Sequence, residues 1–182
     1  MKIFAFCGYM RCGKDTAADF VVQMHAGFEK IAIASTLKET CRVLFDFNHD
    51  QVNGNDKDNV DSRYGVTPRN VLQFMGTEVM QFKIEKLMPG IGRTFWINQL
   101  IGKMDKNPNH GYVICDMRFN HEYHALKNKY GNDVVVVRIE NYRARPSNTH
   151  VSEHEWMLIP SDITIENNGT IEEFYAKLSA IQ

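Results

Sequence analysis

The 182-residue chain has no marked excess of charge of either sign, with 21 Lys and Arg against 22 Asp and Glu and a formal net charge of -1. A protein that holds nucleic acid by neutralising phosphates normally has a clear basic excess. Polymeric nucleic acid is therefore not an expected partner, and any phosphate recognition must be local. Long apolar runs are also absent, because the stretches 2–7 and 134–137 are far shorter than the roughly 20 residues of a membrane helix. No membrane partner is expected.

Cysteine is scarce, and its spacing excludes two common uses. Cys7, Cys12, Cys41 and Cys115 show neither Cys-x-x-Cys pairs nor the density of a disulfide scaffold, so we expect reduced thiols. A secretory leader is not expected either, because the charged, glycine-containing segment 8–14 interrupts the first apolar run. A cytoplasmic location is the resulting expectation.

The composition, 43% hydrophobic and 24% charged, is that of a globular protein, and the length favours one domain over residues 1–182. Strand signals alternate with helix signals along the chain, which predicts an α/β fold with a central, mostly parallel sheet and helices on both faces. The expected strands are 2–7, 31–33, 112–115, 133–139 and 162–165. The expected helices are 17–24, 37–45, 67–82, about 95–104 and about 120–130, the last with Gly131 as a C-cap, and a final helix that begins at a capping box of Thr170 with Glu173.

The segment 46–67 is rich in Asn, Asp and Gly and has no apolar period. We expect an exposed excursion there. Thr67 and Pro68 then form a predicted N-cap and first-turn proline for the helix that follows.

The segment from Gly8 to Lys14 has two glycines and a lysine at the spacing of a phosphate-binding loop, between a predicted strand and a predicted helix. Glycines let backbone N–H groups surround phosphate oxygens, the helix N-terminus adds its positive dipole, and Lys14 adds a point charge. Arg11 lies within this loop. The alternative is a tight turn with an exposed lysine.

The residue after Lys14 departs from the usual pattern, because Asp15 stands where Ser or Thr normally holds magnesium and Thr16 follows one residue later. Either side chain could supply an oxygen ligand to Mg²⁺. Asp15 could equally be an acidic residue that stabilises the helix start.

Asp116 and Arg118 directly follow a predicted strand, at the sheet edge where open α/β sheets bind ligands. Arg118 could bind a phosphate bidentately, and Asp116 could hold a magnesium ion or orient a second substrate. The alternative for Asp116 is a cap for the next helix.

Together, these segments make the sequence similar to the deoxynucleoside monophosphate kinases of the bacteriophage type. The matching segments, in family order across nearly the whole chain, are 8–20, 75–77, 113–122, 149–153 and 165–173. The resemblance implies a P-loop kinase fold, ATP with Mg²⁺, a deoxynucleoside monophosphate as acceptor and an arginine-bearing lid. For a phage-encoded enzyme it implies the host cytoplasm, and it is compatible with a homodimer.

The resemblance also assigns roles to residues. Arg143 and Arg145 lie in a lid-like segment of about 141–158 and, with Lys14 and Arg118, would neutralise the transferring phosphoryl group. Lys38 and Arg69 would bind the acceptor's phosphate, and Asn167, Asn168 and Gly169 would lie beside adenine. Solvated surface charges, or a simple Asn-Gly turn, are the alternatives.

Other readings remain. His121 and His124, and His150 and His154, have spacings that could suggest zinc, but a surface cluster is favoured because no cysteine pair accompanies them. Trp96 and Phe95 are read as core residues. A P-loop kinase of another phosphorylated acceptor, such as phosphomevalonate or dephospho-coenzyme A, is one alternative function. A non-catalytic nucleotide-binding module is the other.

Overall fold

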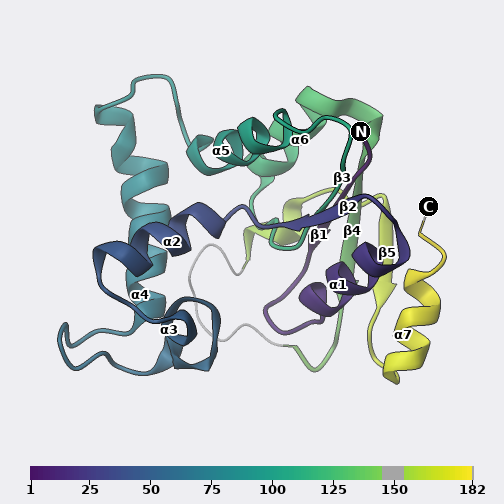
Figure 1. Cartoon of the computed structure of the whole chain (residues 1–182), viewed down its shortest axis with the longest axis horizontal. Helices are drawn as coiled ribbons and strands as arrows, with labels where there is room; N and C mark the ends of the chain where they lie inside the picture. Colours follow the sequence, from purple (N-terminus) through teal and green to yellow (C-terminus); the bar gives the residue numbers. More distant parts are fainter. Residues whose placement is uncertain (145–153, 182) are drawn as a thin grey trace. The chain divides into compact units, whose positions relative to one another are not determined.

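The computed structural model of the chain describes residues 1–144 and 154–181 (Figure 1). The chain divides into two compact units, one formed by Met1–Ala32 with Leu100–Gln182 and the other by Ile33–Gln99. The expectation of one domain over 1–182 stays a prediction.

The first unit is built on a five-stranded sheet whose order is β2-β3-β1-β4-β5. Every pair of neighbouring strands is parallel, which confirms the predicted α/β class with a five-stranded sheet. The strands are β1 (Ile3–Cys7), β2 (Phe28–Ile31), β3 (Gly111–Ile114), β4 (Val134–Glu140) and β5 (Ile163–Glu166).

The expected strand at 31–33 was wrong, because β2 ends at Ile31. Its pairing with β3 begins at Phe28 opposite Gly111. A Cβ atom on Gly111 would lie 2.5 Å from the Phe28 ring, so the glycine makes room for this aromatic side chain at the start of the ladder. Apolarity alone marked Ile33, which is buried but lies beyond the strand.

Both faces of the sheet are covered, as the fully buried strand β1 requires (Figure 1). Phe4 and Phe6 pack in one core with Val21 of α1 (Lys14–Met24) and Phe174 of α7 (Ile171–Leu178). The helix α6 (Asn120–Tyr130) lies against the opposite face, where Leu126 is fully buried. In the strand order, β1 lies at the centre of the sheet, between β3 and β4. Its carboxyl end is therefore a topological switch point, which is where such sheets usually bind ligands.

Several predicted boundaries are confirmed. The helices α5 (Phe95–Met104) and α6 begin and end as expected, and Gly131 follows α6 with a φ of 56°. Thr170 and Glu173 form the predicted capping box of α7. Two short helices, η4 (Gly131–Asp133) and η6 (Glu155–Leu158), complete the described part of this unit. Among the described residues, no helix has both the length and the apolarity for crossing a bilayer.

The second unit is helical. Its elements are α2 (Ser35–Leu44), α3 (His49–Asn53), η1 (Asn55–Asp58), α4 (Pro68–Gln73), η2 (Phe74–Phe82), η3 (Lys83–Lys86) and the first half of α5. Thr67 caps α4 with its side chain and Pro68 occupies the first turn, as predicted.

The predicted helix 67–82 changes its winding at Phe74 and continues as the π-helix η2. Trp96 donates its indole N–H to the carbonyl oxygen of Gly76 over 2.9 Å, so a buried oxygen of this helix is satisfied by a side chain. A Cβ atom on Gly76 would meet the Leu37 side chain at 2.5 Å, which shows how closely α2 approaches. Trp96 is 7% exposed, which confirms its reading as a core residue.

The segment 46–67 is less irregular than expected, because it contains α3 and η1 and buries Phe47 and Val52 in a small core. The helix α3 forms because Asn48 and Gln51 make a capping box at its start. A sequence without an apolar period can thus begin a short helix with a local capping box.

Candidate functional site

The phosphate-binding loop begins where β1 ends, and two glycines allow its path. Gly8 has a φ of 141°, and a Cβ atom there would lie 2.4 Å from the carbonyl oxygen of Ile139. Gly13 has a φ of 106°, and a Cβ atom there would lie 2.5 Å from the Asn167 amide nitrogen. Arg11 also has a positive φ, 63°. The loop therefore curls tightly at the switch point, where a residue with a side chain would clash at either glycine.

The start of α1, like that of α2, has no side-chain cap, in contrast to the starts of three other helices. Asn48, Thr67 and Thr170 cap α3, α4 and α7 with their side chains. The N-cap of α1 is Gly13, and no side chain caps this helix. The first N–H groups of α1 and its dipole are thus directed at the loop, as in helix termini that bind phosphate.

Lys14 lies at the base of this loop and is only 8% exposed. Its ammonium group donates to the carbonyl oxygens of Gly8, over 2.8 Å, and of Tyr9. The sulfur of Cys12 lies 3.7 Å from the same nitrogen. The positive charge is therefore held inside the loop by oxygen acceptors of its own backbone, at the position from which it can bind an anion.

Two thiols lie beneath the loop and are fully buried. Burial raises the pKa of Cys7 to about 11, opposed by Arg138 and then by Lys14. Burial also raises the pKa of Cys12 above its ordinary value, opposed by Lys14. Both thiols are therefore neutral near pH 7 and act as small packing groups. Both are free thiols, as the cysteine spacing in the sequence predicted.

Asp15 and Thr16 occupy the first turn of α1. The Asp15 carboxylate lies 3.3 Å from the Lys30 ammonium, which also bonds to Asp19. Thr16 is partly buried. Both residues carry oxygen atoms suited to Mg²⁺, and in this structure Asp15 has a basic partner.

The strand β3 continues into the segment that carries Asp116 and Arg118, because Met117 donates its backbone N–H to Phe6 of β1. Met117 is fully buried, whereas Asp116 and Arg118 are partly exposed. The backbone thus stays bonded to β1 as far as Met117, beyond the end of β3 at Ile114. Two charged side chains lie beyond the carboxyl end of β3, as predicted.

Glu122 holds this segment in place. One oxygen of its carboxyl group accepts from the backbone N–H groups of Arg118, over 2.8 Å, and of Phe119, over 3.0 Å. Burial raises the pKa of Glu122 to about 8, with Asp116 adding to the shift and the two N–H groups and Arg118 opposing it. Glu122 ends the segment 113–122 that matched the family, but the sequence pattern assigned no role to it. Its place at the third position of α6 was the available signal.

The turn between β5 and α7 contacts both the phosphate-binding loop and the loop after β4. Asn167 donates its side-chain amide to the carbonyl oxygen of Cys12 over 2.9 Å. Asn168 accepts at its side-chain oxygen from the backbone N–H of Tyr142 over 3.1 Å. Gly169 completes the turn, with no room for a Cβ atom beside the Glu173 carboxylate.

Arg143 lies near the start of the segment 141–158 that was predicted to be lid-like. Its backbone N–H donates to the Asn141 side chain over 2.9 Å, and its guanidinium lies 5.4 Å from the ring centre of Tyr142. Arg143 is exposed. Arg145 lies outside the described residues, as do Thr149 to Glu153, so the lid-like segment stays a prediction beyond position 144.

The last part of that segment, the helix η6, contacts the phosphate-binding loop. Trp156 of η6 is 5% exposed and meets Tyr9 edge to face, with ring centres 4.7 Å apart. Arg138 of β4 lies over the Trp156 ring and donates to the Ile159 carbonyl oxygen over 2.6 Å. Sequence reasoning missed this contact, because nothing in the spacing of Tyr9 and Trp156 relates them.

The two residues predicted to bind the acceptor belong to the second unit. Lys38 lies in the first turn of α2 and is partly buried. Arg69 lies in the first turn of α4, and its guanidinium forms a two-point ion pair with Asp58 of η1. The first unit brings Lys14, Cys12 and Asn167 into direct contact. His121 and His124 lie on α6, and within 1–144 and 154–181 no group of three or more metal-binding side chains forms.

Comparison with known proteins gives one family. The family described as deoxynucleotide monophosphate kinase matches residues 45–178. A protein of Acanthamoeba polyphaga mimivirus, provisionally described as a deoxynucleotide monophosphate kinase, is 33% identical over 98% of this chain and 94% of its own length. The deoxynucleotide monophosphate kinase of enterobacteria phage T4 is 23% identical over 66% of this chain and 46% of its own. Among solved structures, a dephospho-CoA kinase from Campylobacter jejuni aligns over 98% of this chain and 94% of its own, with a TM-score of 0.46 and 12% identity.

Proposed function

Because the chain belongs to the deoxynucleotide monophosphate kinase family, whose members are phosphotransferases, we propose that it transfers the γ-phosphoryl group of ATP to a deoxynucleoside 5'-monophosphate. The products are ADP and the deoxynucleoside diphosphate. The observation that carries the proposal is the uncapped start of α1, with the Lys14 ammonium held inside the loop that precedes it. The relatives are viral, and the reaction would take place in the host cytoplasm.

The donor's phosphates bind to the backbone N–H groups of the loop Gly8 to Lys14 and of the first turn of α1. Lys14 exchanges the carbonyl oxygens of Gly8 and Tyr9 for phosphate oxygens, which are stronger partners for an ammonium group. Arg11, in the same loop, adds a second positive charge. Asn167, Asn168 and Gly169 lie beside the adenine ring, and the bond from Asn167 to Cys12 supports this placement.

The residues at this site suit a magnesium ion, because Asp15, Thr16 and Asp116 offer the oxygen atoms that this hard cation prefers. When bound, Mg²⁺ neutralises charge on the phosphate oxygens. Asp15 must release Lys30 if it is to contribute, and Lys30 keeps Asp19 as a partner.

In the transfer step, an oxygen of the acceptor's phosphate forms a bond to the γ-phosphorus, and the bond from that phosphorus to the β–γ bridging oxygen breaks. The bridging oxygen leaves with the electron pair on ADP. The passing phosphoryl group needs cations around its oxygens rather than a covalent partner. Lys14, Arg118, Arg143 and Arg145 supply them in this proposal, while Lys38 and Arg69 hold the acceptor's own phosphate.

A coupled assay for ADP tests the proposal, with ATP and Mg²⁺ against a panel of dNMPs, NMPs, phosphomevalonate and dephospho-coenzyme A. We expect turnover with at least one dNMP and its loss in Lys14→Ala, with an unchanged circular dichroism spectrum. Lys129→Ala, which removes an exposed ammonium paired with Asp105, is the matched control and should retain full activity. Turnover confined to the non-nucleotides, or a Lys14→Ala variant with normal turnover, would refute the assignment.

A further inference from the structure

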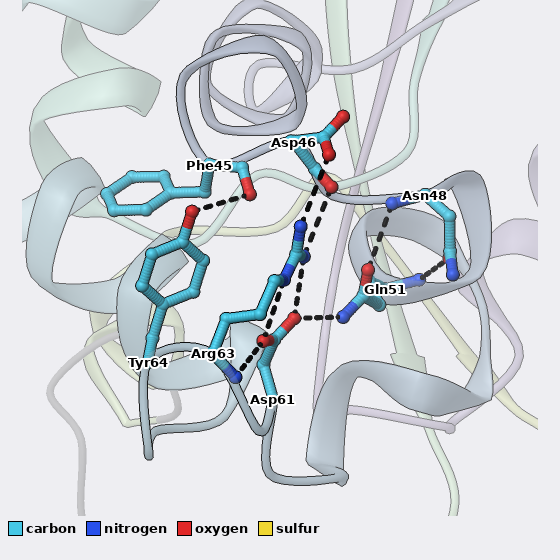
Figure 2. Close-up of polar contacts among 7 residues, drawn as sticks. All are labelled: Phe45, Asp46, Asn48, Gln51, Asp61, Arg63 and Tyr64. Carbon is cyan, nitrogen blue, oxygen red and sulfur yellow. Dashed lines mark hydrogen bonds and ion pairs between the residues drawn. The ribbon is translucent and has the colours of Figure 1, made fainter.

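A network of polar contacts joins the two ends of the segment 46–67 (Figure 2). Arg63 binds Asp61, which is 7% exposed, and also Asp46 at the other end of the segment. Gln51 donates to the same Asp61 carboxylate over 2.7 Å, and Tyr64 donates to the Phe45 carbonyl oxygen over 3.1 Å. These contacts fix both ends of the segment to each other, so that the helix η1 between them has a defined position within the second unit.

Figure 2 also shows that one guanidinium group can bind acceptors on two edges at once. The Nε and Nη2 atoms of Arg63 donate to the two Asp61 carboxylate oxygens over 3.0 and 2.8 Å. The Nη1 and Nη2 atoms donate to the Asp46 carboxylate and carbonyl oxygens over 3.3 and 3.1 Å. A carboxylate bound to the Nε and Nη2 atoms therefore leaves the edge formed by Nη1 and Nη2 with a geometry suitable for two further oxygens.

Arg69 makes the first of these two contacts, the one between the Nε and Nη2 edge and a carboxylate. Its Nε and Nη2 atoms donate to the two carboxylate oxygens of Asp58, the latter over 3.1 Å. The Arg69 side chain is 20% exposed. Asp58 comes from η1, which lies against α4 and is held there by the contacts that join the ends of the segment. An arginine has several rotatable bonds, and this two-point contact removes most of its freedom.

We propose that Asp58 is a positioning residue for Arg69: by binding the Nε and Nη2 edge, it directs the Nη1 and Nη2 edge toward the phosphate of the nucleotide acceptor. This inference rests on the proposed function, in which Arg69 holds that phosphate. It assigns a role to the segment 46–67 within the reaction, since η1 of this segment carries Asp58. The carboxylate and the phosphate occupy different edges, so they bind Arg69 together rather than in competition.

The test is steady-state kinetics of the wild type, Asp58→Asn, Arg69→Ala and the double variant, with the dNMP that the wild type uses. Loss of orientation should raise the KM for the dNMP roughly tenfold in Asp58→Asn, with kcat and the KM for ATP little changed. Arg69→Ala should raise the same KM at least as much. If Asp58 acts on the acceptor through Arg69, the double variant should equal Arg69→Ala.

Asp56→Asn is the matched control, since it makes the same change of charge in the same helix η1 at a carboxylate bonded to Asn59. Its KM should match that of the wild type. Thermal melting of each variant, together with Asp58→Glu, which keeps the charge, separates positioning from folding. Partial recovery of the KM in Asp58→Glu supports the proposal.

Three results would overturn it. An unchanged KM in Asp58→Asn removes the role, a lowered KM shows that Asp58 competes with the phosphate, and additive effects in the double variant show a purely structural contribution. In each case wild-type turnover of a dNMP remains, so the proposed function stands. If the wild type turns over no dNMP, both the proposed function and this inference fail.

Discussion

The side-chain amide of Asn167 donates a hydrogen bond to the carbonyl oxygen of Cys12, 155 residues away, over 2.9 Å. This bond links the turn before α7 to the middle of the phosphate-binding loop. Asn167 itself is held to the sheet, because its backbone N–H donates to the Glu140 carbonyl oxygen over 2.7 Å. The glycines allow the path of the loop, and the bond from Asn167 holds the loop to the turn before α7.

Removal of this bond should weaken nucleotide binding. Replacing Asn167 with Ala should raise the KM for ATP roughly fivefold, the value of one neutral hydrogen bond of about 1 kcal/mol. The kcat should change less, because the cations remain in place. Asn98→Ala is the matched control, since it loses an exposed side-chain contact to Thr94 at a residue outside the proposed nucleotide site. Equal KM values for ATP in both variants would contradict the role of Asn167.

Arg143 should act on the transfer step rather than on binding. We expect Arg143→Ala, alone or with Arg145→Ala, to lower kcat by roughly a hundredfold or more, the usual loss for a cation on a transferring phosphoryl group. The KM for ATP should change little. Arg42→Ala removes an exposed arginine paired with Glu39 and serves as a control without effect. An unchanged kcat in the double variant would exclude these arginines from the mechanism.

Patterns within a single segment predicted the fold well. Apolar spacing and the caps at Gly131 and Thr170 located α6 and α7, and the glycine spacing located the loop before Lys14. The boundary of β2 was missed, because the packing of Phe28 on Gly111 joins residues far apart in the sequence. No local pattern shows such a contact.

The site was predictable only in part, for the same reason. Family resemblance listed Asn167, but its bond to Cys12 depends on how β5 pairs with β4. The pair of Arg69 with Asp58 joins α4 to η1, and η1 lies in the segment 46–67, which has no apolar period. Charges in a loop could be read only as solvated or functional, whereas the folded chain shows which carboxylate each arginine contacts.

Arg11 holds a backbone conformation that costs energy. Its φ of 63° is left-handed, which disfavours a residue with a Cβ atom by about 1–2 kcal/mol, whereas glycine has no such cost. Arg11→Gly should therefore raise the melting temperature slightly, after part of the gain is offset by the greater freedom of glycine in the unfolded chain. Arg11→Ala is the matched control, because it loses the same charge and keeps the strain.

Both Arg11 variants should bind ATP more weakly than the wild type, since both lose a cation in the phosphate-binding loop. Calorimetry of ATP binding and thermal melting together check the prediction. If Arg11→Gly and Arg11→Ala melted at the same temperature, backbone strain at this position would be negligible.

Trp96 should matter to stability through its indole N–H. Trp96→Phe leaves the buried Gly76 carbonyl oxygen without its donor, which typically costs about 1–3 kcal/mol, and the smaller ring leaves unfilled space. We expect a loss in the free energy of unfolding of at least this size, measured by urea denaturation. An unchanged midpoint would mean that the π-helix η2 does not need this hydrogen bond.

Glu122 should make stability depend on pH in an unusual direction. The pKa of its carboxyl group is about 8 in the folded protein, against an ordinary value of 4.5, because burial disfavours the charged form. The folded state therefore keeps a proton that the unfolded state releases between these pH values. The stabilisation is fully present below pH 4.5 and is lost as the pH rises toward 8, by an amount on the order of a few kcal/mol.

Glu122→Gln isolates this effect, because the amide oxygen still accepts from the N–H groups of Arg118 and Phe119 and carries no charge at any pH. We expect the melting temperature of Glu122→Gln to rise relative to that of the wild type between pH 5 and pH 8. Glu173→Gln changes the equivalent capping residue of α7 at an exposed site and should follow the wild-type curve. If all three curves ran parallel, the Glu122 carboxyl group would not keep its proton in the folded protein, and the segment from Asp116 to Arg118 would be held by a carboxylate ion instead.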